Sequence, residues 1–316
     1  MLPQPSFEII GIDNIDISDR WNIHPFLSSQ SSPKTRTSIK TFGLLHPPIV
    51  HKLSANQYQL ICGHIRLAIF REIFVNEKDI TVLVLDEKTI SKTILSYILE
   101  DQLLSGTISP MEKACFFHIA LNYTNTDEAA VLFSPILSQK LQPHSINKML
   151  LLLDLEPELK IDLHNGIIGE KIALELLQLS PEDRLTLHGI IQKLELGGGK
   201  QKRLLTLSKD LALGQGKTIK ELLGEFDFQD ILNHPEMNHP QKTSNLLTML
   251  QKKLFPQSNA AEEQFLKNVS RMGLPASCSI SHSQSFEKNE VSVILNFHNL
   301  AEVEQRLSSI KQLIER

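Results

Sequence analysis

Apolar and polar positions alternate near the N-terminus, at Phe7, Ile9, Ile12, Ile15 and Ile17, which predicts a strand and then an extended arm over residues 7–25. A polar loop is expected at residues 28–32. Short segments of helical and strand spacing follow and complete a small α/β unit. They predict helices at 33–42 and 64–74 and strands at 48–52, 58–62 and 80–85.

From residue 90 to residue 213 the apolar positions repeat with helical spacing almost without interruption. Pro, Gly, Asn and Ser residues divide this stretch into separate helices. The expected helices are 90–104, 110–122, 126–133, 144–153, 156–165, 169–177, 181–194 and 200–213. The pattern therefore predicts an all-helical middle domain.

The last part of the chain changes pattern again. Beyond a proline-containing connection, it predicts helices at 243–255, 260–272 and 300–314, with a hairpin of strands 279–283 and 291–297 around Lys288-Asn289. The fold class expected for the whole chain is α+β. The expected parts are an α/β domain at 1–89, a helical domain at 90–224, a linker at 225–242 and a small α+β unit at 243–316.

Composition narrows the class of protein. The chain has 316 residues, of which 41% are hydrophobic, as in ordinary soluble globular proteins. No apolar stretch approaches the roughly 20 residues of a membrane span, and the N-terminus does not resemble a signal peptide. We therefore expect a cytoplasmic protein with no membrane partner. The net charge of −4 means that any contact with DNA must be local.

A glycine stands at the start of the helix expected at 64–74. Gly63 follows a strand, and His64 and Arg66 fall in the first turn of the helix. Glycine lets a bound anion approach the backbone, and the free N–H groups and dipole of a helix N-terminus favour phosphate. Arg66 could hold the phosphate with its planar guanidinium. The sequence therefore predicts a phosphate site at these three residues.

This turn resembles the "G-x-x-R" turn of the ParB family, whose N-terminal domain is related in fold to sulfiredoxin. The resemblance implies a turn that holds nucleotide phosphates, with CTP or another nucleoside triphosphate and Mg as candidate cofactors. In partition proteins the turn usually reads G-E-R-R, but this chain has His64 at the Glu position and Ile65 at the first Arg. The usual glutamate helps to arrange a metal-bound triphosphate, so we expect binding without appreciable turnover. We also expect binding to strengthen as His64 protonates near about pH 6.

A second match lies at residues 100–114. In ParB-like proteins the corresponding run is "E-N-x-Q-R … L-x-P-x-E-x-A", a polar patch that faces the nucleotide, followed by a helix. The resemblance implies that Asp101 and Gln102 face the phosphates, whereas Leu104 and Ser105 replace the Gln and Arg of a second phosphate contact. The rest of the match, Ser109-Pro110 with Glu112, also forms a helix capping box and could be purely structural.

The helix expected at 144–153 resembles the recognition helix of the ParB helix-turn-helix. Pro157-Glu158-Leu159 resembles the start of the helix that follows it in that family, and residues 163–173 resemble a later turn. A recognition helix needs polar or basic groups at its start to reach bases and phosphates. His144, Ser145, Asn147 and Lys148 supply them, while Leu150 to Leu153 would pack inward. The alternative is an ordinary packed helix with a polar start.

Basic residues gather at the start of the helix expected at 200–213, where Lys200, Lys202 and Arg203 follow three glycines. Such a cluster can contact DNA phosphates. A solvated helix face is the alternative.

Together these features predict a ParB-like DNA-binding protein of partition or regulatory type, with a degenerate nucleotide-phosphate pocket and a homodimeric state. The C-terminal unit is the candidate for pairing two chains. Two alternatives stay open: a nucleotide-dependent enzyme (CTPase, kinase or nuclease) on the same fold, and an interaction adaptor that does not bind DNA. The enzyme would need an acidic metal set beyond Asp101, which the sequence does not show.

Overall fold

The chain divides into two compact units, Met1–Lys202 and Arg203–Arg316, in a computed structural model that describes residues 5–26, 33–283 and 290–314. Helix α10 (Gly198–Gln215) runs across this division. The division does not coincide with the boundaries expected after residues 89 and 224, and those boundaries stay a prediction. The loop expected at 28–32 and the turn around Lys288-Asn289 lie outside the described residues.

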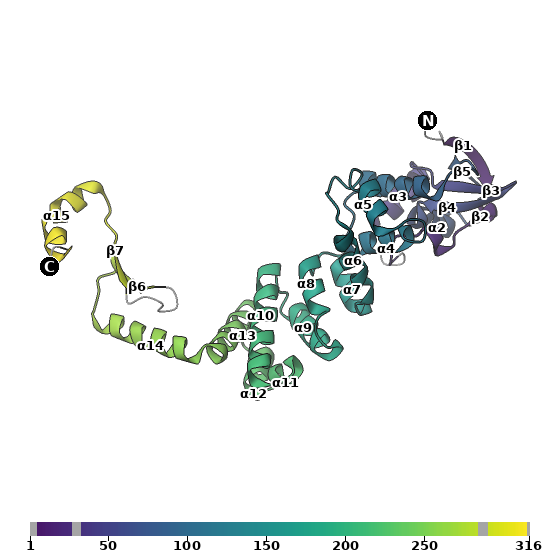
Figure 1. The fold of residues 1–316 in the computed structure, drawn as a ribbon. Helices are drawn as coiled ribbons and strands as arrows, with labels where there is room; N and C mark the ends of the chain where they lie inside the picture. The colour runs from purple at the N-terminus through teal and green to yellow at the C-terminus, as the bar shows by residue number, and fades with distance from the viewer. Residues whose placement is uncertain (1–4, 27–32, 284–289, 315–316) are drawn as a thin grey trace. The chain divides into compact units, whose positions relative to one another are not determined.

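A five-stranded sheet opens the first unit, in the order β1-β5-β3-β4-β2 (Figure 1). β3 and β4 form an antiparallel hairpin, and Asn56 in its turn has a φ of 58°, a left-handed conformation that Asn tolerates. β1 pairs with β5 in antiparallel fashion, while β5 with β3 and β4 with β2 are parallel pairs. The strands are β1 (Ser6–Gly11), β2 (Ile15–Asp16), β3 (Ile49–Ser54), β4 (Gln57–Cys62) and β5 (Asp79–Leu85).

The sheet is covered on both faces because alternate strand residues point to opposite sides. On β5, Val82 and Val84 share a core with Leu67 of α2 (His64–Ile73). Leu83 and Leu85 instead contact the core that includes α3 (Ser91–Ser105). α1 (Pro33–Phe42) packs against α2. Strand β4 and helix α2 are therefore fixed from both sides, and the short connection at Gly63 is held between them.

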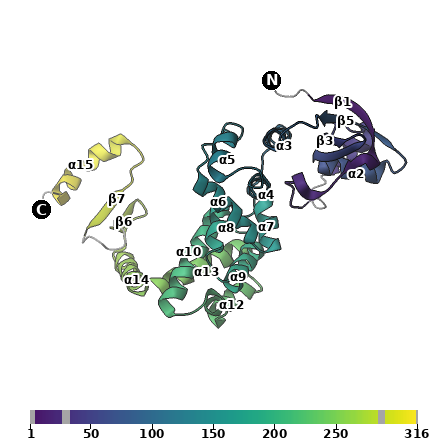
Figure 2. The same ribbon diagram turned by 45° about the vertical axis from the view of Figure 1, so that its right-hand side comes forward.

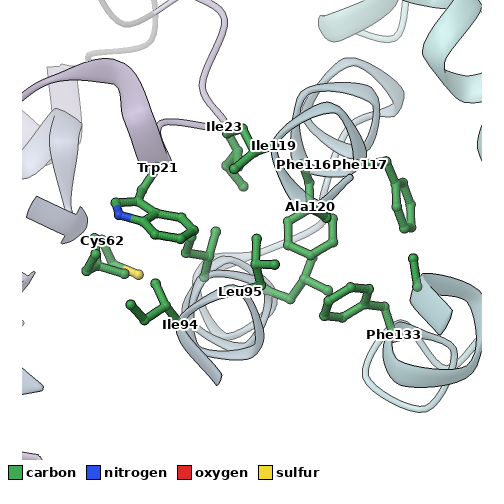
Figure 3. Packing of buried hydrophobic residues seen from close by; sticks show 14 of the residues in the cluster. Trp21, Ile23, Cys62, Ile94, Leu95, Phe116, Phe117, Ile119, Ala120 and Phe133 are labelled. Atoms are coloured by element: carbon green, nitrogen blue, oxygen red, sulfur yellow. The ribbon is translucent and has the colours of Figure 1, made fainter. Parts of the chain in front are cut away.

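An aromatic cluster joins the sheet to the helices (Figure 3). Trp21 comes from the N-terminal arm, at the end of the short helix η2 (Asp19–Trp21). It shares the core with Phe116 and Phe117 of α4 (Pro110–Ala120) and Phe133 of α5 (Thr126–Phe133), and all four side chains are almost fully buried. The rings of Phe116 and Phe133 meet edge to face with centroids 4.9 Å apart. Burying one such ring contributes about 1.5–3 kcal/mol, so this cluster anchors α4 beside the sheet.

The remaining helices of the first unit follow α4. Proline stands at the first position of α4, α6, α7 and α9, where the missing N–H would have no helical partner. α6 and α7 lie beside α4 (Figures 1 and 2). The helices are α6 (Pro143–Leu151), η3 (Leu152–Asp154), α7 (Pro157–His164), α8 (Glu170–Leu176) and α9 (Pro181–Lys193).

The second unit contains more helix than the sequence predicts. Within residues 225–242, where an irregular connection was expected, α12 (Phe226–Asn233) buries Phe228, Ile231 and Leu232 and packs against α13 (His239–Leu254). The β6–β7 hairpin is antiparallel, as expected. The other elements are α11 (Ile219–Leu223), α14 (Pro256–Arg271), β6 (Cys278–His282), β7 (Val291–Leu295) and α15 (Leu300–Ile314). The α+β class predicted from the sequence is confirmed.

Candidate functional site

The connection from β4 to α2 has the geometry of an anion site. Gly63 has a φ of +95°, a left-handed conformation that side chains rarely adopt. A Cβ at this position would also meet Pro48 Cα and Arg66 Nη2, each at 3.3 Å. The first N–H groups of α2 have no acceptor within the helix and point out of its N-terminus. Gly63 thus leaves this positively polarised helix end open to a ligand.

A cavity of about 870 Å³ lies in front of this helix end. Its volume is in the range of pockets that enclose a small ligand or cofactor. Its walls come from the N-terminal arm, α1 and the residues after it, the start of α2, the end of α3 and the start of α4. The lining residues are His24, Thr35, His46, Gly63, His64, Ile65, Arg66, Asp101, Gln102, Leu104, Ser105 and Glu112.

The Arg66 guanidinium is paired with a carboxylate from α3. Arg66 Nη2 donates to Asp101 Oδ2 at 3.2 Å and lies 3.4 Å from Oδ1. Both side chains are partly buried. An entering phosphate would have to share the guanidinium with Asp101, whose negative charge opposes it.

His64 is buried at the floor of the cavity, with 7% of its surface exposed. Its Nε2 has no hydrogen-bond partner among the described residues. Burial, and then the neighbouring His24, lower the pKa of His64 from 6.5 to about 4, and Asp19 only partly opposes this. The expectation that His64 protonates near pH 6 is therefore wrong, because desolvation keeps the imidazole neutral.

Glu112 organises the opposite wall. Its Oε1 accepts hydrogen bonds from His24 Nδ1 at 2.9 Å and Gln102 Nε2 at 3.3 Å, and its Oε2 accepts from the Ser109 N–H at 2.9 Å. Burial raises the pKa of Glu112, but the hydrogen bonds from His24 and Ser109 outweigh it, so the pKa lies below 4.5. Glu112 thus completes the expected capping box and also presents a fixed negative charge at the cavity.

The structure brings Gly63, His64, Arg66, Asp101 and Gln102 around one cavity, as the sequence suggested, and their role in binding stays a prediction. Leu104, which is 87% exposed, and Ser105 line the same cavity. Three other lining side chains were not predicted, because they come from distant segments without a motif, and Glu112 was predicted only as part of a helix cap. Only the spacing of Ser109 and Glu112 carried a signal, and it indicated a helix cap. The three residues that were not predicted are His24, Thr35 and His46.

The residues predicted to contact DNA lie elsewhere in the fold. On α6, His144, Asn147 and Lys148 are exposed and Ser145 is half-buried, while Ile146 and Met149 enter the core. This leaves the polar start of the helix accessible. The prediction that Leu150 to Leu153 all pack inward is wrong for Leu151, which is 51% exposed, because α6 ends at this residue and η3 begins.

The basic residues at the start of α10 are also accessible. Lys200, Lys202 and Arg203 are exposed, and the Arg203 guanidinium donates to Gln251 Oε1. Gly198 and Gly199 lie inside the first turn of α10 rather than in a loop before it. These side chains are exposed to solvent. Both interpretations of the cluster, a contact with DNA and a solvated helix face, require this exposure.

The comparisons with known proteins give structural neighbours of low similarity. No family model and no curated protein matches the sequence. The chain is similar to solved structures of the chromosome-partitioning protein ParB from Caulobacter crescentus, C-terminally truncated, and of a Pnob8-like ParB-N domain. These neighbours are ParB proteins and a ParB domain. Their family is the one that the motifs at Gly63 and Ser109 resemble.

The similarity is low in every measure. The Caulobacter protein in complex with the parS site is 14% identical at a TM-score of 0.36, covering 63% of this chain and 98% of that chain. The Caulobacter protein in complex with CTP-gamma-S is 15% identical at a TM-score of 0.27, and the match covers 56% of this chain and 94% of that chain. The Pnob8-like ParB-N domain is 16% identical at a TM-score of 0.37, and the match covers 79% of this chain and 98% of that chain. At these values the similarity identifies no binding residue of this chain.

A magnesium ion does not fit the residues at the cavity. Asp101 is engaged by Arg66, and Glu112 by His24, Gln102 and Ser109. Across residues 5–26, 33–283 and 290–314, no group of three His, Cys, Asp or Glu side chains could hold a metal ion. In the same residues, no helix is both long and apolar enough to cross a bilayer.

Proposed function

We propose that this chain is a ParB-like DNA-binding protein whose N-terminal domain binds a nucleotide through its phosphate. One observation carries the proposal: the open N-terminus of α2 at Gly63, with Arg66 in its first turn, faces a cavity of about 870 Å³. Backbone N–H groups, a helix dipole and a guanidinium together form a site for an anion. The cavity leaves room for a nucleoside beside the phosphate.

DNA is the proposed macromolecular partner. The exposed start of α6, with Asn147 and Lys148, would read bases, and Lys200, Lys202 and Arg203 would contact phosphates. One of the Caulobacter structures contains the parS site and another contains CTP-gamma-S, and we propose the same two classes of ligand here. Whether the role is partition or regulation would follow from the DNA sequence that is bound.

We further propose a cytoplasmic homodimer that pairs through the C-terminal unit. Support comes from β7, where Val291, Val293, Ile294 and Leu295 are all exposed. Apolar strand residues in such a row favour burial against another surface.

The proposal is tested with the full chain in two assays. Fluorescence anisotropy with a random duplex at several salt concentrations should show binding that weakens as salt rises, because phosphate contacts release counterions. Calorimetry with cytidine and adenosine nucleotides should give saturable heat for at least one of them. If neither duplex nor nucleotide binds, the chain is an interaction adaptor. Hydrolysis of a nucleotide would instead favour the enzyme alternative.

A further inference from the structure

The fixed charges around the cavity are mostly negative. Among the described residues that line the cavity, Arg66 is the one Arg or Lys, and its side chain stays positively charged at any pH near 7. Asp101 and Glu112 are the two carboxylates. The geometry places Asp101 directly on the guanidinium. Glu112 is held as an anion by His24 and Ser109. One positive charge therefore stands against two negative charges.

Three neighbouring residues that could have added positive charge to the cavity do not do so. Ile65 follows His64 in the first turn of α2 and carries no charge. Leu104 and Ser105, at the end of α3, border the cavity with an apolar and a neutral side chain. Burial and His24 keep His64 neutral at pH 7. A chain of phosphates would thus meet one guanidinium and no second cation from these elements.

His64 supplies a different kind of contact. Its Nε2 is buried and has no hydrogen-bond partner among the described residues, although the ring lines the cavity. A buried polar atom without a partner costs free energy, so a shift of the ring that lets a ligand atom bond to Nε2 would be favoured. A neutral imidazole offers one hydrogen bond without adding charge. The site therefore combines one charge-assisted contact with neutral ones.

We propose that this pocket selects a ligand with a single phosphate group, such as a nucleoside monophosphate, and binds it without a divalent metal ion. The inference rests on the proposed function and specifies its ligand class. The single phosphate would lie at the N-terminus of α2 between Gly63 and Arg66, with His64 beneath it. Each further phosphate adds negative charge that Asp101 and Glu112 oppose. The carboxylates are already engaged by protein groups, which leaves no metal set to neutralise a polyphosphate.

The test is calorimetry on the full chain at pH 7 with CMP, CDP and CTP, each with Mg²⁺ and with EDTA. CMP should bind at least about tenfold more tightly than CTP in EDTA, and Mg²⁺ should change the CMP affinity by less than about twofold. Tighter binding of CTP with Mg²⁺ than of CMP would overturn this inference and leave the proposed function standing. No heat with any nucleotide would overturn both.

A charge variant tests the cause of the selectivity. Asp101→Asn removes the carboxylate charge but keeps the shape, so it should narrow the preference for CMP over CTP by about fivefold or more. Asp13→Asn is the matched control, because Asp13 is exposed on the short helix η1 (Ile12–Asn14) and does not line the cavity. An unchanged CMP-to-CTP ratio in Asp101→Asn would refute the electrostatic cause, and with it the proposal.

Discussion

The buried imidazole of His64 predicts an acid sensitivity that can be measured without any ligand. Its pKa is about 4 in the folded chain against an ordinary value of 6.5. The unfolded chain therefore takes up a proton first as the pH falls, and folding loses stability between about pH 6.5 and pH 4. The difference of about 2.5 between the two pKa values corresponds to about 3 kcal/mol in full.

The measurement is cleanest at pH 5. At this pH, protonation of His64 in the unfolded chain should lower the free energy of unfolding by about 2 kcal/mol relative to pH 7. The contribution of Glu112 changes little in this window, because an unfolded glutamate titrates near 4.5 and the folded pKa lies lower still, so its loss of stability comes mainly below pH 5. Comparison of pH 7 with pH 5 thus isolates the histidine from the carboxylate.

The assay is urea unfolding followed by the fluorescence of the single tryptophan. Trp21 is buried next to the site, where its Nε1 donates to Gln59 Oε1 at 3.1 Å and its ring stacks on Tyr123. Its signal therefore reports the unit that contains His64. The loss between pH 7 and pH 5 should be about 2 kcal/mol smaller in His64→Gln than in the native chain. The exposed His118 on α4 provides the control variant, His118→Gln, which should behave as native. Equal losses in His64→Gln and native protein would refute the reasoning.

Three further outcomes follow from the surface and the core. Replacing Lys200, Lys202 and Arg203 together by Ala should weaken binding to a random duplex and reduce the slope of log K against log salt by up to about three, and an unchanged slope would remove these residues from the interface. Asn147→Ala should cost about 1–3 kcal/mol on the preferred DNA site alone, measured by anisotropy; an equal loss on random DNA would make α6 an ordinary packed helix. Phe133→Ala should destabilise the first unit by about 3–5 kcal/mol in the tryptophan assay, and a loss below about 1 kcal/mol would contradict the described packing.

Much of the fold could be predicted because local signals define its helices. The helices at 33–42, 126–133 and 300–314 have the predicted bounds. The helix at 126–133 is capped by Asn125, whose side chain accepts a hydrogen bond from the Glu128 N–H. An Asn at this position favours a helix start and can be recognised from the sequence. Prolines at first helical positions set other starts in the same way.

The second unit shows where such signals fail. Pro235 and Pro240 predicted an irregular connection over 225–242, yet α12 ends before the first proline and α13 begins just before the second. The apolar stripe of Phe228, Ile231 and Leu232 is short, and its burial depends on α13. Tertiary packing therefore decided the structure of a segment whose local pattern was weak.

The candidate site shows the same difference between local patterns and tertiary contacts. Gly63 and Arg66 could be predicted because a glycine between a strand and a helix is a local pattern. The pairing of His24 with Glu112 could not, since these residues are 88 positions apart in the sequence. The pKa of His64 was also out of reach, because it depends on burial and on His24 rather than on the residue itself.

The most direct test of the phosphate site is calorimetry of Arg66→Ala with the cytidine nucleotide that binds the native chain most tightly. Loss of the guanidinium should weaken binding at least about tenfold, since it removes a charge-assisted contact and leaves Asp101 facing the ligand. Arg271→Ala, at the exposed end of α14, should bind as the native chain does. Binding by a folded Arg66→Ala variant within about twofold of native would contradict a phosphate site at the N-terminus of α2.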